Sequence, residues 1–427
     1  MTRLRVLYAP RDIAGQPSTW ARGLRALGVH AEVWSFGEPA FGLVADRVWD
    51  ADRLLADPAY RWEVLDRAVR GFDVVHLQYG RSLLNAHEPL LPALWDVPLL
   101  RSLGKKVFMH WHGSDVRLRS VHMEREPDSY LKDAVVDEAR IHAMVEIARR
   151  YCDRMFVSTP GLLDYVPDAE LVPLAIDPAQ WATARGTEPA VPVVVHLPSK
   201  RATKGSHLVD AALRPLDAEG VVAYRPLSGL SRAEVAAEFA RADIVVDSLT
   251  IGDHGMVAVE AMACGAIAVA HVHERNRART PGCPVVEAVG ADLADVVRAL
   301  AADPDERARL REESVAWVAK RHDVGAVARQ LLAAYREPPV PVVADRPDWP
   351  LVDGRGRVTA LEAEISRLRQ ALGRHGARAA TVPPRSARAR VEDRPRLHLL
   401  VRRLDALRRR LRAAVRTQAG KAPKNTA

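Results

Sequence analysis

The feature that most constrains the fold is an alternation of short apolar runs with helical patterns over the first part of the chain. Each run is apolar throughout, which is typical of parallel strands that helices cover on both faces. The five runs are Leu4–Ala9, Ala31–Phe36, Asp73–Gln78, Val107–Trp111 and Met155–Thr159. They predict a Rossmann-like, doubly wound α/β domain over residues 1–180.

The same pattern then restarts. A second set of runs, again separated by helical patterns, consists of Pro192–Leu197, Val221–Tyr224, Ile244–Ser248, Ile267–Val272 and Pro284–Val286. Two consecutive series of this kind predict a second Rossmann-like domain, at 181–340, after the first. The joint is expected near 177–192, where Pro, Gly, Thr and Ala accumulate around Trp181.

The C-terminal part has a different character. Residues 341–384 combine a Pro-rich linker with a heptad-like run of apolar residues, and residues 385–427 form an Arg-rich amphipathic tail. Apolar residues recur at 3- and 4-residue spacing in both, at Val358, Leu361, Ile365, Leu368 and Leu372, and at Leu397, Leu400, Leu404, Leu407 and Leu411. This spacing predicts a helical, coiled-coil-like extension, or amphipathic helices packed on their own domain.

Charge sets the tail apart from the body. The tail has 14 Arg and Lys residues against three acidic ones, so the remaining 384 residues carry a net charge of about −3 out of the total of +8. A Leu-lined, Arg-rich helix is suited to an anionic membrane surface, and the leucines would equally serve a homo-oligomer. Nucleic-acid binding is disfavoured because the tail lacks aromatic residues and a known binding motif.

Composition limits the remaining classes. A 427-residue chain with 48% hydrophobic residues can form two or three domains with their own cores. Its three cysteines, without a CxxC pair, predict neither a disulfide framework nor a zinc site. The apolar start is too short for a signal peptide, and the longest apolar stretch, Met256–Val272, is interrupted by polar residues and glycine. We therefore expect a cytoplasmic protein, or one peripheral on the inner face of the membrane.

The segment 247–270, DSLTIGDHGMVAVEAMACGAIAVA, carries the strongest chemical signal. A strand ends at Asp247, a loop with Gly252 and Gly255 follows, and a short apolar helix then carries Glu260. Parallel sheets bind ligands at the carboxyl ends of their strands, and a helix that opens after glycine presents backbone N–H groups to phosphate. The carboxylate one turn into the helix can accept hydrogen bonds from ribose hydroxyls.

Four further segments lie at the ends of predicted strands. HLPSKRATKG, at 196–205, displays Arg201 and Lys204 ahead of a helix, which is a suitable anion site. HWHGSDVR, at 110–117, displays His112 at the end of a strand, whereas His110 belongs to the strand itself. The first strand leads into a loop that contains Gly15. HLQYGRSLL, at 76–84, could line an acceptor pocket.

GDHGMVAVEAMACG resembles the donor-binding signature of retaining glycosyltransferases of family 4, also called glycosyl transferases group 1, over roughly residues 1–340. This resemblance implies a GT-B fold, in which two Rossmann-like domains face a cleft. In the family seven residues separate two glutamates, and the second matches Glu260, the ribose-binding position. The first, which contacts the donor sugar, matches Gly252, and the adjacent Asp253 could replace it.

The resemblance also implies the remaining site. The donor would be a nucleotide sugar such as a UDP- or GDP-sugar, bound by Gly15, Arg201, Lys204, Asp253, His254, Gly255, Met256, Val257 and Glu260. His112, Arg201 and Lys204 would act in catalysis, with the two cations holding the departing diphosphate in place of a metal. Neither a metal nor another cofactor is expected. The acceptor would be a glycan, a lipid-linked or a small molecule, as in cell-envelope polysaccharide synthesis.

Three other functions are alternatives for the same sequence. A sugar-nucleotide epimerase with the same fold would need further acid and base groups around the donor, and the sequence does not decide this. A phosphorylase would need a lysine for pyridoxal phosphate. An inactive, transferase-like scaffold would use the C-terminal helices as its working part, and the glycine at position 252 is compatible with it.

Overall fold

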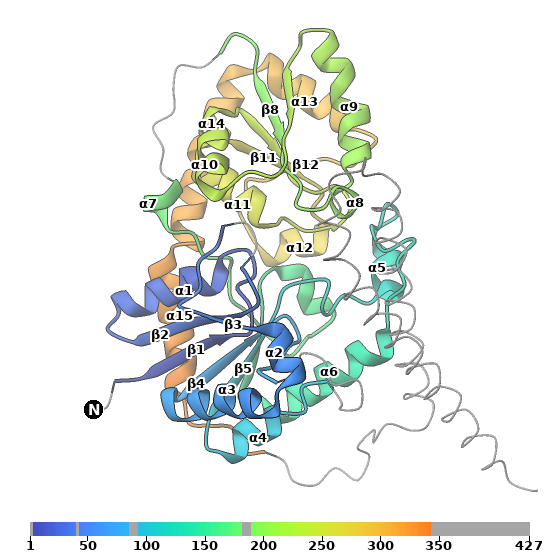
Figure 1. Cartoon of the computed structure of the whole chain (residues 1–427). Coiled ribbons are helices and arrows are strands. Elements are labelled where there is room, and N and C mark those ends of the chain that lie inside the picture. The colour runs from blue at the N-terminus through green and yellow to red at the C-terminus, as the bar shows by residue number, and fades with distance from the viewer. Residues whose placement is uncertain (1–2, 40–41, 85–92, 182–188, 343–427) are drawn as a thin grey trace, which may run out of the picture. The chain divides into compact units, whose positions relative to one another are not determined.

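The computed structural model describes residues 3–39, 42–84, 93–181 and 189–342 (Figure 1). The predicted heptad run and the basic tail at 385–427 lie outside these ranges. Residues 1–136 and 144–342 form one compact unit that contains two β-sheets. Within the described ranges, no helix combines the length and the apolar character that a bilayer crossing requires.

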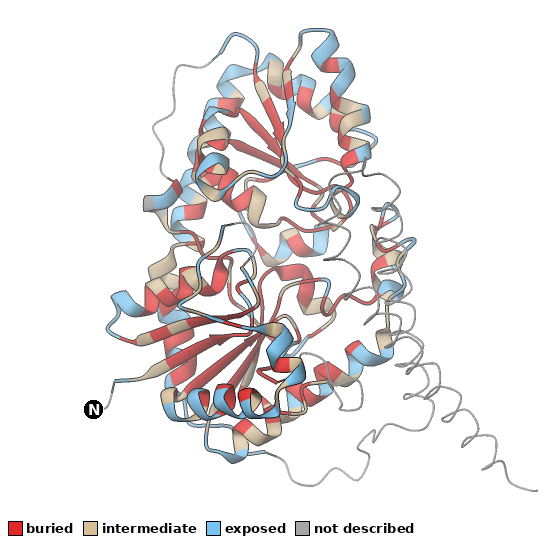
Figure 2. Ribbon diagram, viewed as in Figure 1, coloured by how far each residue is buried: buried red, intermediate tan, exposed pale blue. Residues whose placement is uncertain are grey.

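The first sheet has seven parallel strands in the order β3-β2-β1-β4-β5-β6-β7. Their bounds are β1 Arg5–Ala9, β2 His30–Phe36, β3 Arg47–Trp49, β4 Val74–Gln78, β5 Lys106–Trp111, β6 Arg154–Val157 and β7 Glu170–Leu171. The central strands are almost wholly buried, as Figure 2 shows in red. Burial on both faces explains why their sequences are apolar without alternation.

The second sheet has five parallel strands in the order β12-β11-β10-β8-β9. Their bounds are β8 Val193–His196, β9 Ala223–Pro226, β10 Ile244–Val246, β11 Ile267–Ala270 and β12 Val286–Glu287. Strand β10 lies at the centre and is fully buried. Each of the ten predicted runs therefore overlaps a strand, and the prediction of two doubly wound α/β domains is confirmed.

Two strands were not predicted from the sequence. β3 and β7 are three and two residues long, lie at the two edges of the first sheet, and are only partly buried. An edge strand needs neither length nor a continuous apolar run, because only one side pairs with the sheet. Such strands leave little signal in a single sequence.

Helices cover both sheets. Those in the first part of the chain are α1 Gln16–Ala26, α2 Ala51–Ala56, α3 Pro58–Gly71, α4 Val97–Ser102, α5 Arg119–Arg125, α6 Glu138–Tyr151 and the 3₁₀ turn η1 Pro160–Asp164. The later ones are α7 Pro178–Trp181, α8 Arg201–Lys204, α9 Ser206–Ala218, α10 Arg232–Arg241, α11 Met256–Ala263, α12 Glu274–Arg279, α13 Leu293–Ala302, α14 Pro304–Arg321 and α15 Val324–Arg336.

The last helix, α15, returns to the first sheet and packs against α1 (Figure 1). The Tyr335 hydroxyl hydrogen bonds to the Tyr8 hydroxyl at 3.0 Å and to His76 Nδ1 at 2.5 Å, all in a buried position. We call the seven-stranded sheet with its helices and α15 the first lobe, and the five-stranded sheet with its helices the second lobe. Thus the predicted range 181–340 includes a helix that completes the core of the first lobe.

Candidate functional site

Two predicted donor-binding segments meet at the carboxylate of Asp247, the residue that follows β10. Its Oδ1 accepts a 2.6 Å hydrogen bond from the Lys204 ammonium, and its Oδ2 accepts a 2.7 Å bond from the backbone N–H of Gly255. The Asp247 side chain is 1% exposed and that of Lys204 is 12% exposed. This buried carboxylate therefore holds the basic turn after β8 beside the start of α11.

The start of α11 is closely packed. A Cβ added at Gly255 would lie 3.1 Å from both the Lys204 ammonium and an Asp247 oxygen, so glycine allows the three groups to approach. The Val259 N–H donates to the Gly255 carbonyl, whereas the first-turn N–H groups of a helix have no acceptor within it. A lysine ammonium beside such a helix end is suited to an anionic ligand.

Glu260 lies one turn into α11 and is buried. Its Oε1 is 3.5 Å from the Nη2 of Arg232, the first residue of α10. Burial raises the pKa of Glu260 to about 8, the Arg232 charge opposes this rise, and the Asp247 charge adds to it. Below pH 8 the carboxyl group is therefore mostly neutral, and it can both donate and accept hydrogen bonds.

Arg201, which was predicted to act together with Lys204, points to a different carboxylate. Its Nη2 lies 2.6 Å from Asp210 Oδ2 in α9, and 54% of its side chain is exposed. Asp210 also accepts a 2.7 Å hydrogen bond from the Tyr224 hydroxyl. The structure thus brings Lys204 to Gly255, at the start of the helix that carries Glu260, but leaves Arg201 in a surface pair.

The predicted glycine loop of the first lobe lies beside the same site. Gly15 has φ 72°, and a Cβ there would come within 2.2 Å of Arg232 Nη1. The next residue, Gln16, exchanges two hydrogen bonds with the backbone of Ala175, and its amide nitrogen is 3.2 Å from Met256 Sδ. Gly15 and Met256 therefore lie close together although they are 241 positions apart in sequence.

His112 follows β5 and has both ring nitrogens engaged. Nε2 lies 2.8 Å from the Gln78 amide oxygen, so Nε2 carries the proton, and Nδ1 lies 3.0 Å from the Ser158 hydroxyl, which donates to it. Burial lowers the pKa of His112 to about 3. The ring is therefore a neutral, oriented group, and its predicted contact with the donor sugar or acceptor stays a prediction. His110 lies within β5, as expected, and is fully buried.

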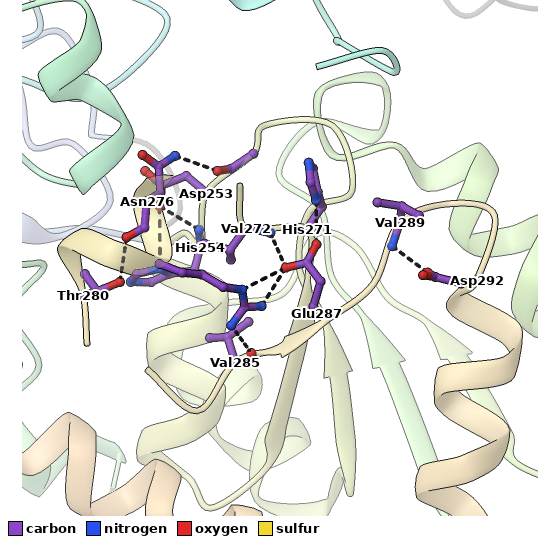
Figure 3. A network of polar contacts seen from close by, with 12 residues as sticks. Asp253, His254, His271, Val272, Asn276, Thr280, Val285, Glu287, Val289 and Asp292 are labelled. Atoms are coloured by element: carbon purple, nitrogen blue, oxygen red, sulfur yellow. Dashed lines mark hydrogen bonds and ion pairs between the residues drawn. The ribbon is translucent and has the colours of Figure 1, made fainter. Parts of the chain in front are cut away.

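Asp253 and His254 lie in the polar network of the loop after β10 (Figure 3), and Asp253 also contacts the first lobe. Asp253 Oδ2 accepts a 2.8 Å hydrogen bond from the Gly161 N–H in η1 of the first lobe, and Oδ1 accepts one of 3.0 Å from the His254 N–H. The His254 ring is buried against Trp317 at 5.8 Å between ring centroids. Val257 packs at the edge of the apolar core of the second lobe.

A carboxylate from the first lobe occupies the space beside Gly252. Gly252 has φ 71°, and a Cβ there would lie 1.9 Å from Glu126 Oε1. Glu126 caps the C-terminus of α5, and its Oε2 is 2.8 Å from His271 Nε2, while Nδ1 of that histidine is 2.6 Å from Glu287 Oε1. The position where the resemblance expects a glutamate is therefore filled by a glutamate from elsewhere in the chain.

A cavity of about 20 Å³ lies beside this contact. A space of this size holds an ordered water and is far too small for a sugar ring. Its lining comes from both lobes and mixes cations, carboxylates and an amide, namely Arg117, His122, Arg125, Glu126, Gly161, Asp164, Tyr165, Ile251, Asp253, His273 and Asn276. Sugar binding here would require the two lobes, or the Glu126 side chain, to move.

Sequence reasoning missed three charged residues at this site. Asp247 had a signal, because an acid directly after a buried parallel strand lies at the edge where ligands bind. Glu126 and Arg232 had none, since their approach to Gly252 and Gly15 depends on the contact between the lobes. Among the described residues, no cluster of three or more His, Cys, Asp or Glu side chains could hold a metal ion.

Comparisons with known proteins concern the fold and the enzyme class. The glycosyl transferase-like family profile matches residues 213–333, which include α10 and α11. HepE of Anabaena, solved with UDP and glucose, has a TM-score of 0.56 at 15% identity, over 78% of this chain and 99% of that chain. Sucrose-phosphate synthase of Thermosynechococcus elongatus gives 0.55 at 15% identity, over 78% and 98%.

The catalytic domain of starch synthase IV of Arabidopsis thaliana, bound to ADP and acarbose, gives 0.50 at 12% identity, over 78% of this chain and 99% of that chain. No curated protein matches the sequence. At such identities the structural likeness establishes the fold. Together with the family match it confirms the predicted GT-B fold and the predicted enzyme class, a glycosyltransferase.

The contact at Gly252 predicts a specific cost of substitution. Gly252→Ala should displace the Glu126 carboxylate from His271 and lower the free energy of unfolding by about 1.5–3 kcal/mol beyond the cost of a left-handed alanine. Gly282→Ala is the matched control, because Gly282 has φ 72° and nothing within 4 Å of an added Cβ. Denaturant unfolding measures both, and equal losses in the two variants would contradict the contact.

His271 predicts a pH dependence of stability. Its hydrogen bonds to Glu126 and Glu287 raise its pKa to about 9, and Arg277 also binds Glu287, at 2.6 Å. Because the folded pKa exceeds the usual value near 6.5, the stabilisation is complete below pH 6.5 and is lost as the pH rises to about 9. The loss should be about 2 kcal/mol after allowance for solvent screening.

The measurement is denaturant unfolding from pH 6 to 10 for the wild type and His271→Gln. The wild type should lose its advantage over the variant across this range, so that the two curves converge above pH 9. Exposed His207 provides the control, because His207→Gln should follow the wild type at every pH. A constant difference between wild type and His271→Gln would show that the histidine is not charged in the folded protein.

Proposed function

We propose that the chain transfers a sugar from a nucleotide sugar to an acceptor hydroxyl with retention of anomeric configuration and without a metal. The observation that carries this proposal is the shared Asp247 carboxylate, which holds Lys204 and Gly255 together at the start of α11, one turn before Glu260. A cation and unpaired helix amides suit a diphosphate, and a carboxyl group nearby suits ribose hydroxyls. HepE, which was solved with UDP and glucose, has the same fold.

In this proposal the donor lies with its diphosphate at the Lys204 ammonium and the first-turn amides of Met256 and Val257. Gly15 lets the first-lobe loop approach from the other side. Lys204 turns from Asp247 to the phosphate oxygens as negative charge grows on them, which stabilises the departing diphosphate. Asp253 and His254 hold the loop in shape.

The reaction would proceed through an oxocarbenium-like sugar. The bond between the anomeric carbon and the diphosphate oxygen breaks, and the acceptor oxygen bonds to that carbon on the same face. The acceptor proton passes to an oxygen of the leaving diphosphate, so no protein nucleophile is needed. Exclusion of water matters because water would compete with the acceptor, and closure of the two lobes over the donor would provide it.

The acceptor is proposed to be a glycan, a lipid-linked or a small molecule, as in the synthesis of cell-envelope polysaccharides. The basic segment 385–427, outside the described residues, would bind anionic lipid headgroups at the inner face of the membrane, and the heptad segments would pair with a second copy. These two contacts are predictions from the sequence alone. Sedimentation with anionic vesicles at low salt, compared with a chain ending at Pro384, tests the first.

Binding of UDP, GDP and ADP by the wild type is the first test of the function, and Glu260 provides the site-specific one. Glu260→Ala should weaken nucleoside diphosphate binding by about 5- to 150-fold in calorimetry, because ribose hydroxyls that lose their hydrogen-bond partner cost about 1–3 kcal/mol. Glu260→Gln should lose less, because its amide oxygen still accepts.

The matched control is Glu313→Ala, which removes a glutamate from a surface pair with Arg309. Unchanged affinity in Glu260→Ala would remove this residue from the donor site. Incubation of the wild type with a nucleotide sugar and no acceptor separates the rival functions. An epimerase yields a new nucleotide sugar, an inactive scaffold yields nothing, and a transferase yields slow hydrolysis or transfer once an acceptor is supplied.

Removal of the Lys204 charge should lower turnover, and a paired substitution can separate this effect from a loss of stability. Lys204→Ala alone would leave Asp247 buried without its cation, which costs about 3–5 kcal/mol of stability. Lys204→Met combined with Asp247→Asn removes both charges, and the asparagine oxygen still accepts from Gly255. This double variant should fold like the wild type in thermal unfolding but lose about 10²–10³-fold in turnover.

The same assay tests the role of metal ions. Wild-type turnover should persist in EDTA, because Lys204 supplies the positive charge. A strict requirement for manganese or magnesium, or near-normal turnover of the double variant, would contradict the proposed stabilisation of the diphosphate.

A further inference from the structure

Arg232 lies between the two predicted donor-binding loops. It is the first residue of α10, its Nη1 is 3.4 Å from the carbonyl oxygen of Ala14, and its Nη2 is 3.5 Å from Glu260 Oε1. Ala14 precedes the first-lobe glycine, and Glu260 belongs to the second lobe. A single guanidinium group therefore contacts both sides of the donor site.

The guanidinium group of Arg232 lies over a buried aromatic ring, and its two polar contacts are long. The guanidinium carbon lies 5.1 Å from the centroid of the Trp181 ring, within the range of a cation–π contact. Trp181 is buried in the apolar core of the second lobe. The two polar contacts of the guanidinium are near the upper limit for hydrogen bonds and ion pairs.

The other cations near the site are bound more tightly. Lys204 lies 2.6 Å from Asp247, and Arg201 lies 2.6 Å from Asp210, on a surface that faces α9. A ligand can therefore bind Arg232 by replacing its two long polar contacts, to the Ala14 carbonyl and to Glu260.

The groups around Arg232 compensate its charge only in part. Two carboxyl groups face it, Glu260 and Asp12, together with the Ala14 carbonyl oxygen. Burial raises the pKa of Glu260 to about 8, which leaves that group mostly neutral at pH 7, and burial also raises the pKa of Asp12. An under-compensated guanidinium attracts an anion, and its planar pair of N–H groups matches two phosphate oxygens.

We propose that Arg232 binds the diphosphate of the donor and acts there as the second cation beside Lys204. This inference rests on the proposed function and names a binding residue within the same site. When the diphosphate arrives, the guanidinium exchanges the Ala14 carbonyl and Glu260 for phosphate oxygens. Glu260 is then available to the ribose hydroxyls, and the first-lobe loop at Gly15 lies over the phosphates.

Gly15 is part of the same arrangement. A Cβ at this position would come within 2.2 Å of Arg232 Nη1, and the residue has a φ of 72°. Any side chain here would push the guanidinium away from its place between the lobes. The requirement for glycine at position 15 thus follows from the position of Arg232 as well as from the turn itself.

The experiment compares full-length variants by calorimetry with UDP, GDP and ADP and with the corresponding nucleosides. Arg232→Ala should bind the preferred nucleoside diphosphate at least 10-fold more weakly, while its affinity for the nucleoside changes less than twofold. Arg232→Lys should recover part of the loss. Arg241→Ala is the matched control, since Arg241 ends the same helix in a surface pair with Glu238 at 3.7 Å, and it should bind like the wild type.

Three results would overturn the inference, and they are distinguishable. Equal losses for nucleoside and nucleoside diphosphate would mean that Arg232 acts through Glu260 on the ribose. A large loss in Arg201→Ala with normal binding in Arg232→Ala would assign the second cation to Arg201. Failure of the folded wild type to bind any of the three diphosphates would overturn the proposed function and this inference with it, whereas the first two results leave the proposed function standing.

Discussion

The buried carboxylate of Asp247 is the contact on which the arrangement of the second lobe depends. It follows the central strand β10, and it binds the Lys204 ammonium from one neighbouring turn and the Gly255 amide from another. Without it, a lysine that is 12% exposed would lack a counter-ion, and the glycine loop would lose its anchor at the start of α11. A buried ion pair is weak evidence for stability but good evidence for a fixed geometry. Here it holds a cation beside free helix amides, ready for exchange with an anionic ligand.

Charged groups also form the contacts between the first and the second lobe, and a ligand would have to replace them too. Glu126, Asp253 and Arg232 each bridge the lobes, through His271, the Gly161 amide and the Ala14 carbonyl respectively. The cavity beside Glu126 and Asp253 holds about one water. The described contacts therefore correspond to a closed arrangement in which the protein's own charged groups satisfy one another. A donor must replace these contacts, so its affinity depends on the difference between two sets of interactions.

The fold could be predicted from the sequence because its signal is local. Apolar runs separated by helical patterns specify parallel strands one by one, and ten of the twelve strands in the described residues were found in this way. The candidate residues of the second lobe could be named for the same reason, since Lys204 follows β8 while Gly255 and Glu260 follow the neighbouring strand β10. Glu126 and Arg232 were not accessible, because their roles arise from a contact between lobes that no local pattern encodes. The packing of α15 on the first lobe, where Tyr335 hydrogen bonds to Tyr8, is likewise a non-local contact that no local pattern encodes.

Gly252 shows how far a local motif can be trusted. The resemblance expects a carboxylate at this position, and from the sequence alone its absence counts against donor binding. The structure places the Glu126 carboxylate 1.9 Å from where the missing side chain would begin. A glycine is then required there, because any side chain would collide with Glu126 while it is bonded to His271. The absence of one residue and the presence of the other are thus a single feature of the molecule. The motif alone shows that a glutamate is missing at position 252. The structure shows that the Glu126 carboxylate of the first lobe lies beside this glycine.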